Sequence, residues 1–251
     1  MIDAALLGGG IGRRFSESNS SASLPKQFQP LGQSTVFVHS LRALLSLGCF
    51  RQIVIAVPKP YIGLAEAQIK DAQVEAGATQ VRIIAGGELR QDSSRLALQA
   101  MTDISPPTRV LIHDACRPYL SQAFLRRIKQ HIDDRSYGAW VPAVPVVDTL
   151  KRIEDQRVIE TVDRSRVFRV QTPQIFEYLI IRELLEKAAA EAAPFTDDAS
   201  ICEYFGIPVG VFEGDVRNIK LTHDFEMATL ARFLEQKEQP CESELVSTPT
   251  V

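Results

Sequence analysis

The sequence predicts an α/β fold, in which a Rossmann-like, mostly parallel sheet has helices on both faces and carries a protruding β-hairpin arm. Two observations predict it. Short apolar runs alternate with segments of helical period through the first 145 residues, and a narrow pair of strand-like segments then interrupts the alternation. Strands that alternate with helices favour a parallel sheet, because each helix returns the chain to the edge where the previous strand began.

The first part of the chain supplies five predicted strands. Ile2–Leu7 is a short apolar run, and Gln52–Val57 is rich in β-branched residues and is followed by Pro58. Both features are typical of buried strands. The predicted strands are 2–7, 52–57, 81–85, 109–113 and 139–144, and the predicted helices between them are 36–47, 61–75, 93–101 and 124–132.

A hairpin arm is predicted after Pro145, at about residues 146–166. Its two short strands, 149–153 and 158–162, flank a polar turn. A two-stranded hairpin is too narrow to hold a core of its own, so we expect the arm to pack against a second subunit of a homodimer.

Beyond the arm the alternation resumes, with a strand at 167–170, a long helix at 176–193 and a strand at 209–213. Thr196 and Thr222 are each predicted to cap a helix that has acidic residues in its first turn. The polar segment 236–251 is predicted to be a disordered tail, which leaves residues 1–235 as a single domain.

Composition excludes several classes of protein. The formal charge of −3 argues against nucleic acid as the main partner, and no apolar run is long enough to cross a membrane. The four cysteines are scattered and form no CxxC pair, and the N-terminus has no signal-peptide pattern. A cytoplasmic protein with reduced thiols is therefore expected.

A glycine-rich loop follows the first predicted strand and is a candidate phosphate site. It contains Gly8, Gly9, Gly10 and Gly12, then Arg13 and Arg14, with Lys26 a little further on. Backbone N–H groups of such loops can cradle phosphate, and the basic side chains add positive charge. The alternative is a flexible basic surface loop. The glycines do not match the dinucleotide-binding order, and no P-loop is present.

The ends of other predicted strands also carry glycines or charges, and in a parallel sheet these ends meet at one edge. Asp114 ends an apolar strand, where a carboxylate can hold Mg²⁺ against a triphosphate; its alternative role is to cap or form a turn. Arg117 can clamp a phosphate or pair with Asp114.

Nine short motifs, in the same order, resemble the 2-C-methyl-D-erythritol 4-phosphate cytidylyltransferase family of the non-mevalonate isoprenoid pathway. They are GGGIGRRF (8–15), PKQF (25–28), GGELRQDS (86–93), HDACRP (113–118), PVVDTLKR (145–152), TVDR (161–164), QTPQIF (171–176), TDDAS (196–200) and NIKLT (218–222). The resemblance implies a fold like that of nucleotide-diphospho-sugar transferases. It also implies transfer of CMP from CTP to a sugar-alcohol phosphate, with Mg²⁺ or another divalent cation as cofactor.

The resemblance also implies roles for individual residues. Arg14, Lys26, Arg164 and Lys220 would be catalytic, with Arg164 reaching the site of a partner subunit, and Asp114 would hold the metal. Nucleotide and substrate would be bound by Gly8, Gly9, Gly10, Gly12, Arg13, Gly87, Glu88, Ser93, Arg117, Thr149 and Thr172.

Departures from the family pattern concern the first loop and a possible second metal ligand. Gly8 and Gly9 stand where the family usually has alanines, and Arg217 stands where some members have an acidic metal ligand, with Asp215 as a weak substitute. Ribitol-5-phosphate cytidylyltransferase is an alternative, disfavoured by TVDR and TDDAS. A non-catalytic nucleotide-binding protein is a further alternative, disfavoured because all the implied basic and acidic site residues are present.

Overall fold

The computed structural model describes residues 2–9, 24–101, 108–191 and 195–238. The strands are β1 (Ile2–Leu7), β2 (Pro30–Leu31), β3 (Ser34–Thr35), β4 (Phe50–Val57), β5 (Gln80–Ala85), β6 (Arg109–Asp114), β7 (Ala139–Pro145), β8 (Leu150–Glu154), β9 (Arg157–Val162), β10 (Phe168–Val170), β11 (Gln174–Glu177) and β12 (Val209–Glu213). The helices are α2 (Val36–Leu45), α3 (Ile62–Asp71), α4 (Arg90–Ala100), α5 (Gln122–Ile132), α6 (Tyr178–Ala190), α7 (Asp198–Tyr204) and α8 (Glu226–Glu238). Short 3-10 turns are η1 (Lys26–Phe28), η2 (Lys59–Tyr61) and η3 (Arg164–Arg166).

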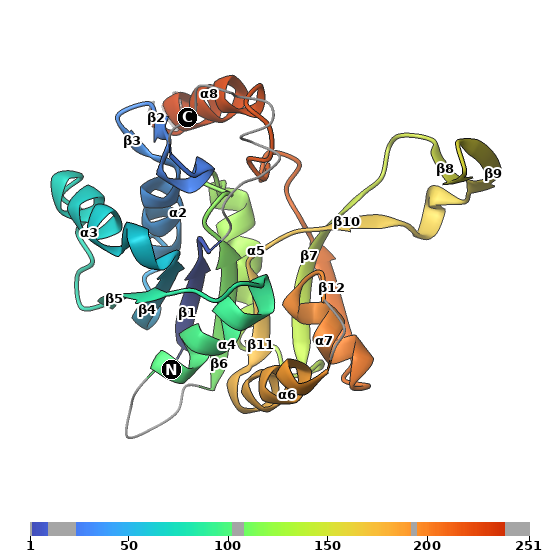
Figure 1. The fold of residues 1–251 in the computed structure, drawn as a ribbon, viewed down its shortest axis with the longest axis horizontal. Coiled ribbons are helices and arrows are strands. Elements are labelled where there is room, and N and C mark those ends of the chain that lie inside the picture. Colours follow the sequence, from blue (N-terminus) through green and yellow to red (C-terminus); the bar gives the residue numbers. More distant parts are fainter. Residues whose placement is uncertain (1, 10–23, 102–107, 192–194, 239–251) are drawn as a thin grey trace, which may run out of the picture.

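A central eight-stranded sheet forms the body of the molecule, in the order β10-β7-β11-β6-β1-β4-β5, with β12 paired to β7 (Figure 1). β1 lies inside the sheet and pairs in parallel with β4 and β6. The mostly parallel α/β fold predicted from the sequence is thus confirmed. None of the helices in the described ranges is long and apolar enough to cross a membrane.

β11 is a strand that the sequence analysis missed. It lies between β6 and β7 and is antiparallel to both. The predicted helix at 176–193 was therefore wrong at its start, because Phe176 and Glu177 belong to this strand and α6 begins at Tyr178. Four apolar and polar residues carry too little periodicity to separate a short buried strand from the first turn of a helix.

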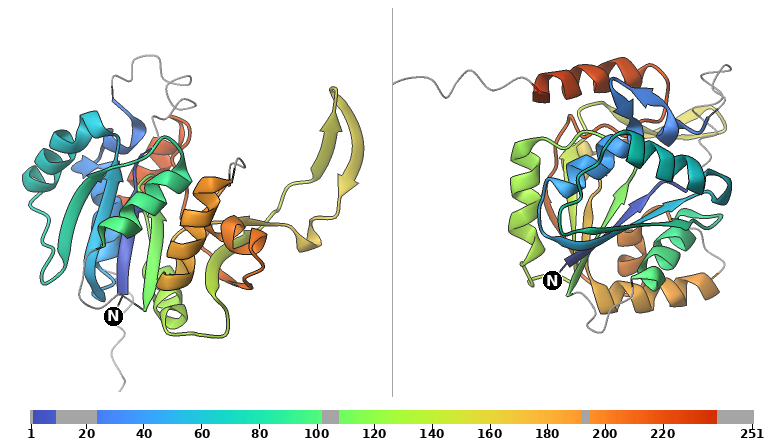
Figure 2. Two further views of the ribbon diagram at one scale, coloured as in Figure 1. Left: turned by 60° about the horizontal axis from the view of Figure 1, so that its bottom comes forward. Right: turned by 90° about the vertical axis from the view of Figure 1, so that its left-hand side faces the viewer.

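Helices lie on both faces of the sheet (Figure 2). One layer of the core lies on each face, and a smaller apolar cluster includes Leu230 of α8. Successive side chains of a strand point to opposite faces, so β1 sends Ala4 and Leu6 to one layer and Ala5 and Leu7 to the other. Helices α2 and α5 cover the first face, and α4, α6 and α7 cover the second. A strand buried on both faces explains why residues 2–7 are apolar apart from Asp3, whose buried carboxylate pairs with Arg51.

The predicted arm is present as the antiparallel hairpin β8–β9, which projects away from the body (Figure 1). Its apolar side chains are not covered by the rest of the chain. Val147, Ile153 and Val158 have 72%, 60% and 59% of their surface exposed, and Phe168 in β10 is also half-exposed.

Two predicted helix starts differ from the structure. Asp197, rather than Thr196, is the N-cap of α7, and its carboxylate accepts a hydrogen bond from the Ser200 N–H at 3.0 Å. α8 begins at Glu226, whose carboxylate accepts hydrogen bonds from the N–H groups of Thr222 and His223. α8 continues to Glu238, so the first three residues of the predicted tail are helical, and 239–251 lie outside the described residues.

Candidate active site

The carboxyl ends of β1 and β6 bring the first candidate residues together. Asp114 is the last residue of β6 and stands opposite Leu7, the last residue of β1. Gly8 follows directly, and its N–H donates to the Ala56 carbonyl at 2.8 Å. The glycine-rich loop therefore starts beside Asp114, at the edge where ligands of parallel α/β sheets bind.

Three cationic side chains, which we call the cation cluster (Arg90, Arg117 and Lys220), surround the Asp114 carboxylate. Lys220 Nζ lies 2.7 Å from Oδ2, Arg90 Nε lies 3.2 Å from Oδ1, and Arg117 Nε lies 3.7 Å from Oδ2. Burial alone would raise the pKa of Asp114, but these positive charges outweigh it and hold the pKa well below its ordinary value. Asp114 is therefore a carboxylate over the whole physiological range of pH.

A chain of hydrogen bonds fixes the backbone beneath this carboxylate. The Asp114 N–H donates to Thr172 Oγ1 at 3.1 Å, and that hydroxyl lies 2.9 Å from His113 Nδ1. Burial lowers the pKa of His113 to about 4, so the imidazole is neutral. His113 Nε2 lies 3.2 Å from the Arg117 carbonyl, which can only accept, so Nε2 carries the proton and Nδ1 accepts from Thr172.

Lys220 belongs to a loop, residues 215–221, that is held by side chains from elsewhere in the chain. Arg117 Nη1 donates to the Asn218 carbonyl at 2.8 Å, and Lys26 Nζ donates to the Leu221 carbonyl at 2.6 Å. Gln171 Nε2 donates to the Asp215 carbonyl at 2.8 Å. Lys26, Arg117 and Lys220, which are far apart in the sequence, are thereby gathered at one place.

Arg90 and Asp198 are site residues that the sequence analysis did not assign, although both lie inside quoted motifs. Arg90 is the first residue of α4, and its Nη1 lies 2.5 Å from Oδ2 of the fully buried Asp198. Arg90 lies in GGELRQDS and Asp198 in TDDAS, and neither had been given a role in the site. A charged residue without a role inside a motif was the signal that could have identified them. Their 108-residue separation in sequence hides the pairing.

Three glycines, which we call the glycine cluster (Gly9, Gly86 and Gly87), surround the start of α4 next to the cation cluster. A Cβ added at Gly9 would lie 2.6 Å from Ser93 Oγ, and one at Gly87 would lie 2.2 Å from Asp92 Cβ. The buried Ser93 hydroxyl in turn accepts a hydrogen bond from the Gly87 N–H at 3.1 Å. Glycine is required here because no side chain fits between the loop and the helix.

The remaining predicted site residues lie elsewhere. Glu88 is exposed beside the glycine cluster. Thr149 and Arg164 are exposed on the arm, where Arg164 donates to the Val147 carbonyl, and they are not part of the cation cluster. Gly10, Gly12, Arg13 and Arg14 lie outside the described residues.

The residues present fit a divalent cation held mainly by its substrate. Within the described ranges, no three acidic, histidine or cysteine side chains gather as a metal site. Asp114 offers one carboxylate, which suits Mg²⁺ because this ion is commonly held by one or two carboxylates together with phosphates and water. Asp215 is not at the same place: its carboxylate accepts hydrogen bonds from Ser121 Oγ and the Arg217 N–H, and none of the described contacts joins it to the cation cluster.

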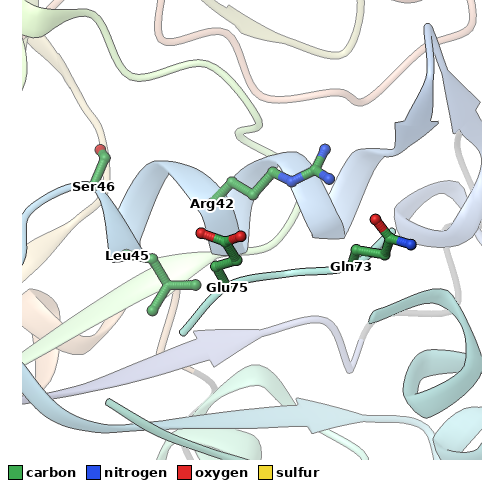
Figure 3. Close-up of a pocket in the computed structure, with 5 residues that line it drawn as sticks. All are labelled: Arg42, Leu45, Ser46, Gln73 and Glu75. Carbon is green, nitrogen blue, oxygen red and sulfur yellow. The ribbon is translucent and has the colours of Figure 1, made fainter. Parts of the chain in front are cut away.

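A separate groove lies at the C-terminal end of α2 (Figure 3). Its residues precede β4 and β5, whereas the candidate active site follows the ends of β1 and β6. Arg42, Leu45, Ser46, Gln73 and Glu75 line it. The Arg42 guanidinium donates to the Ala72 carbonyl at 2.6 Å, so its charge serves to fasten the segment after α3. The groove contains no nucleophile paired with a base.

Comparison with known proteins identifies the family. The model of 2-C-methyl-D-erythritol 4-phosphate cytidylyltransferases matches residues 2–236. The chain belongs to this family. A cytidylyltransferase of that name from Syntrophus aciditrophicus is 37% identical over 242 residues, which cover 94% of this chain and 97% of the relative. The family assignment made from the nine motifs is confirmed.

Other members of the family are longer or have been solved. The bifunctional enzyme IspD/IspF of Allorhizobium ampelinum is 40% identical over 228 residues, 89% of this chain and 54% of that protein. The chain thus spans about half the length of the bifunctional relatives it matches. The crystal structure of 4-diphosphocytidyl-2C-methyl-D-erythritol synthase from Anaerococcus prevotii has the same fold, with a TM-score of 0.76, 24% identity and coverage of 94% and 98% of the two chains.

Proposed function

We propose that this protein transfers CMP from CTP to 2-C-methyl-D-erythritol 4-phosphate and releases pyrophosphate. Membership of the family supports the reaction. The observation that carries it is the cation cluster at the carboxyl ends of β1 and β6, where three cations surround one carboxylate. With Asp198 included, the three cations face two carboxylates, and Lys26 adds a further positive charge nearby. An excess of positive charge is suited to an anionic ligand.

The proposed reaction joins two phosphates that repel each other. An oxygen of the sugar-alcohol phosphate forms a bond to the α-phosphorus of CTP, and the bond from that phosphorus to the β-phosphate oxygen breaks. Lys220, Arg117 and Lys26 would neutralise the charge that gathers on the reacting oxygens, and their fixed positions avoid reorganisation during the step. Arg14 and the other residues outside the described ranges keep the roles implied by the family motifs.

We further propose that Mg²⁺, or another divalent cation, binds at Asp114 together with the phosphates of CTP. When bound, such an ion supplies charge neutralisation and orients the triphosphate. The Asp114 carboxylate suits this role because it is ionised and fixed from both sides.

A homodimer formed through the arm is also proposed. The arm exposes Val147, Ile153 and Val158, and Phe168 in the adjoining strand β10 is half-exposed. The arm also carries Thr149 and Arg164, which are predicted site residues. Exposed apolar side chains on a two-stranded arm support burial against a second copy of the chain, which would bring Arg164 to the partner's site. The mass in solution, measured by light scattering, tests this proposal. A monomer at micromolar concentration would contradict it.

The reaction is tested by incubating the protein with CTP and Mg²⁺, together with either methylerythritol phosphate or ribitol 5-phosphate, and measuring pyrophosphate. We expect release with methylerythritol phosphate. Release with ribitol phosphate alone would select the ribitol enzyme, and CTP binding without any release would select the non-catalytic alternative. The cytoplasmic location stays a prediction that cell fractionation can test.

A further inference from the structure

We propose that Arg90 is a positioning residue that fixes the Asp114 carboxylate in the orientation required by the nucleotide and its metal, with Asp198 as its permanent counter-ion. The inference rests on the proposed function, because it concerns the same site. It assigns a role to two residues for which neither the motifs nor the family match supplies one.

The geometry around Asp114 carries the proposal. Arg90 Nε contacts Oδ1 at 3.2 Å, and Lys220 Nζ contacts Oδ2 at 2.7 Å. The two cations come from different elements, α4 and the 215–221 loop, and each holds one oxygen of the carboxylate. A carboxylate that is held at both oxygens cannot rotate freely about its χ2 bond, so its remaining lone pairs point in a fixed direction.

Asp198 explains why an arginine can be kept at this position. Its carboxylate is fully buried, and its Oδ2 accepts from Arg90 Nη1 at 2.5 Å. A guanidinium presents several N–H groups in a rigid fork, so Arg90 can contact Asp114 and Asp198 at once. A lysine has a single charged nitrogen on a flexible stem and reproduces this double contact poorly.

The pair is not arranged for stability alone. Within the part of the chain that the structure describes, Arg90 Nη2 and Asp198 Oδ1 are buried and have no hydrogen-bond partner. By contrast, the buried ion pair of Asp3 and Arg51 is bidentate, with N···O distances of 2.9 and 2.8 Å. Arg90 gives up the second bond to Asp198 and directs its Nε to Asp114 instead.

Arg90 also connects the two halves of the site. Arg90 is the first residue of α4, and the glycine cluster packs against the start of this helix. The same helix start therefore also carries the guanidinium that holds Asp114. A shift of this helix start on nucleotide binding would therefore be transmitted to the carboxylate. Partners that orient a metal-binding carboxylate typically affect metal affinity or activity by about 10- to 100-fold.

The test compares Arg90→Lys with a matched control, Arg51→Lys. Both arginines pair with a fully buried aspartate, and their side chains are 22% and 20% exposed. Thermal unfolding gives the stability of each variant, and calorimetry gives the factor by which Mg²⁺ tightens CTP binding. For Arg90→Lys we expect this factor to fall about tenfold, with a similar rise in the Mg²⁺ concentration needed for half-maximal turnover. Arg51→Lys should lose stability and keep both values.

An unchanged Mg²⁺ factor in a folded Arg90→Lys protein would overturn the proposal and leave Arg90 with a structural role. If Arg90→Lys does not fold, Asp198→Asn decides, because it keeps Arg90 and removes only the counter-ion's charge. A wild-type Mg²⁺ factor in Asp198→Asn would then contradict the proposal. CTP binding is measured without the second substrate, so an enzyme that acts on neither sugar-alcohol phosphate would refute the proposed function and still allow the role of Arg90 to be scored.

Discussion

Two buried aspartates, one in β1 and one at the end of β6, show how the same chemistry serves two purposes. Asp3 in β1 is satisfied by Arg51 and by the Gln52 amide, with one cation for one carboxylate. Among the residues that the structure describes, three cations surround Asp114, and of these three only Arg90 also contacts a second carboxylate. Folding requires only that a buried charge is compensated. Among the described residues, the surplus of positive charge at Asp114 therefore favours an anionic ligand at this site.

Lys220→Ala is expected to have the largest effect, a loss of turnover that no substitution around Asp3 should produce. Removal of an aimed cation should lower turnover on the order of 10²-fold or more, because its charge is needed most in the transition state. Steady-state pyrophosphate release measures the loss. Lys187→Ala is the control, since Lys187 makes an exposed ion pair with Glu183 on α6, and it should keep full activity. Equal activity of the two variants would show that Lys220 does not contribute to the reaction.

Asp3→Asn should lower stability and leave turnover unchanged. The substitution removes the negative charge of Asp3 that pairs with Arg51, and we expect a loss of about 2 kcal/mol in the free energy of unfolding, below the range for a fully buried pair because Arg51 is partly exposed. Urea unfolding measures the loss, and turnover should be unchanged. A large fall in turnover of the folded variant would show that this end of the sheet also serves catalysis.

Asp215→Asn tests whether a third buried carboxylate supports the site through pH-dependent stability. Burial alone would raise the pKa of Asp215, but hydrogen bonds from Ser121 and Arg217 outweigh it and lower the pKa below 3.8. A lowered pKa in the folded state stabilises the protein above that value, and this contribution is lost as pH falls through the folded pKa. The variant should be less stable than the wild type by about 1–2 kcal/mol near neutral pH.

Urea unfolding from neutral pH down to about pH 3 gives the difference between these two proteins as a function of pH. We expect the difference to be constant from neutral pH to about pH 5 and to shrink below that, as the carboxyl group is protonated first in the unfolded and then in the folded protein. A difference that is independent of pH throughout would mean that the charge of Asp215 is not what stabilises the loop.

The smallest effect is expected at the glycines beside the site. An alanine Cβ at Gly9 would lie 2.6 Å from Ser93 Oγ, whereas at Gly8 the nearest atoms are at 3.4 Å, an ordinary contact. Gly9→Ala should therefore cost about 1 kcal/mol of stability, and Gly8→Ala should be neutral or slightly stabilising. Urea unfolding measures both. Ser93→Ala itself loses the hydrogen bond from the Gly87 N–H, so the strain is measured by adding Gly9→Ala to that variant. In this background Gly9→Ala should cost little, and an undiminished cost would place the strain elsewhere.

Much of the fold could be predicted from local patterns. The strands β1 and β4 at the centre of the sheet are mostly apolar, and the hairpin arm is marked by two strand-like segments around a polar turn. β11 could not be predicted, because a four-residue strand is defined by its pairing with β6 and β7 and has no pattern of its own. The start of α8 was misplaced because Glu226, rather than Thr222, satisfies the free N–H groups.

For the site, sequence reasoning identified the charges but not all of their partners. Asp114, Arg117 and Lys220 were predicted from strand ends and motifs, and they do lie together. Thr172 was expected near the substrate; its hydroxyl is used to connect the Asp114 N–H to His113, and a contact with substrate stays a prediction. Asp198 was interpreted only as part of a helix start, since nothing local reveals a contact with Arg90 across 108 residues.

The way the 215–221 loop is held has a consequence for how freely its sequence can change. Its carbonyls at 215, 218 and 221 accept hydrogen bonds from Gln171, Arg117 and Lys26. A main-chain carbonyl is offered by every amino acid, so these three contacts do not depend on the side chains at 215, 218 and 221. The side chains of Asp215 and Asn218 hold the loop separately, through Ser121 and the Thr172 carbonyl. Val216, whose side chain is 69% exposed, is therefore expected to tolerate substitution without displacing the Lys220 ammonium.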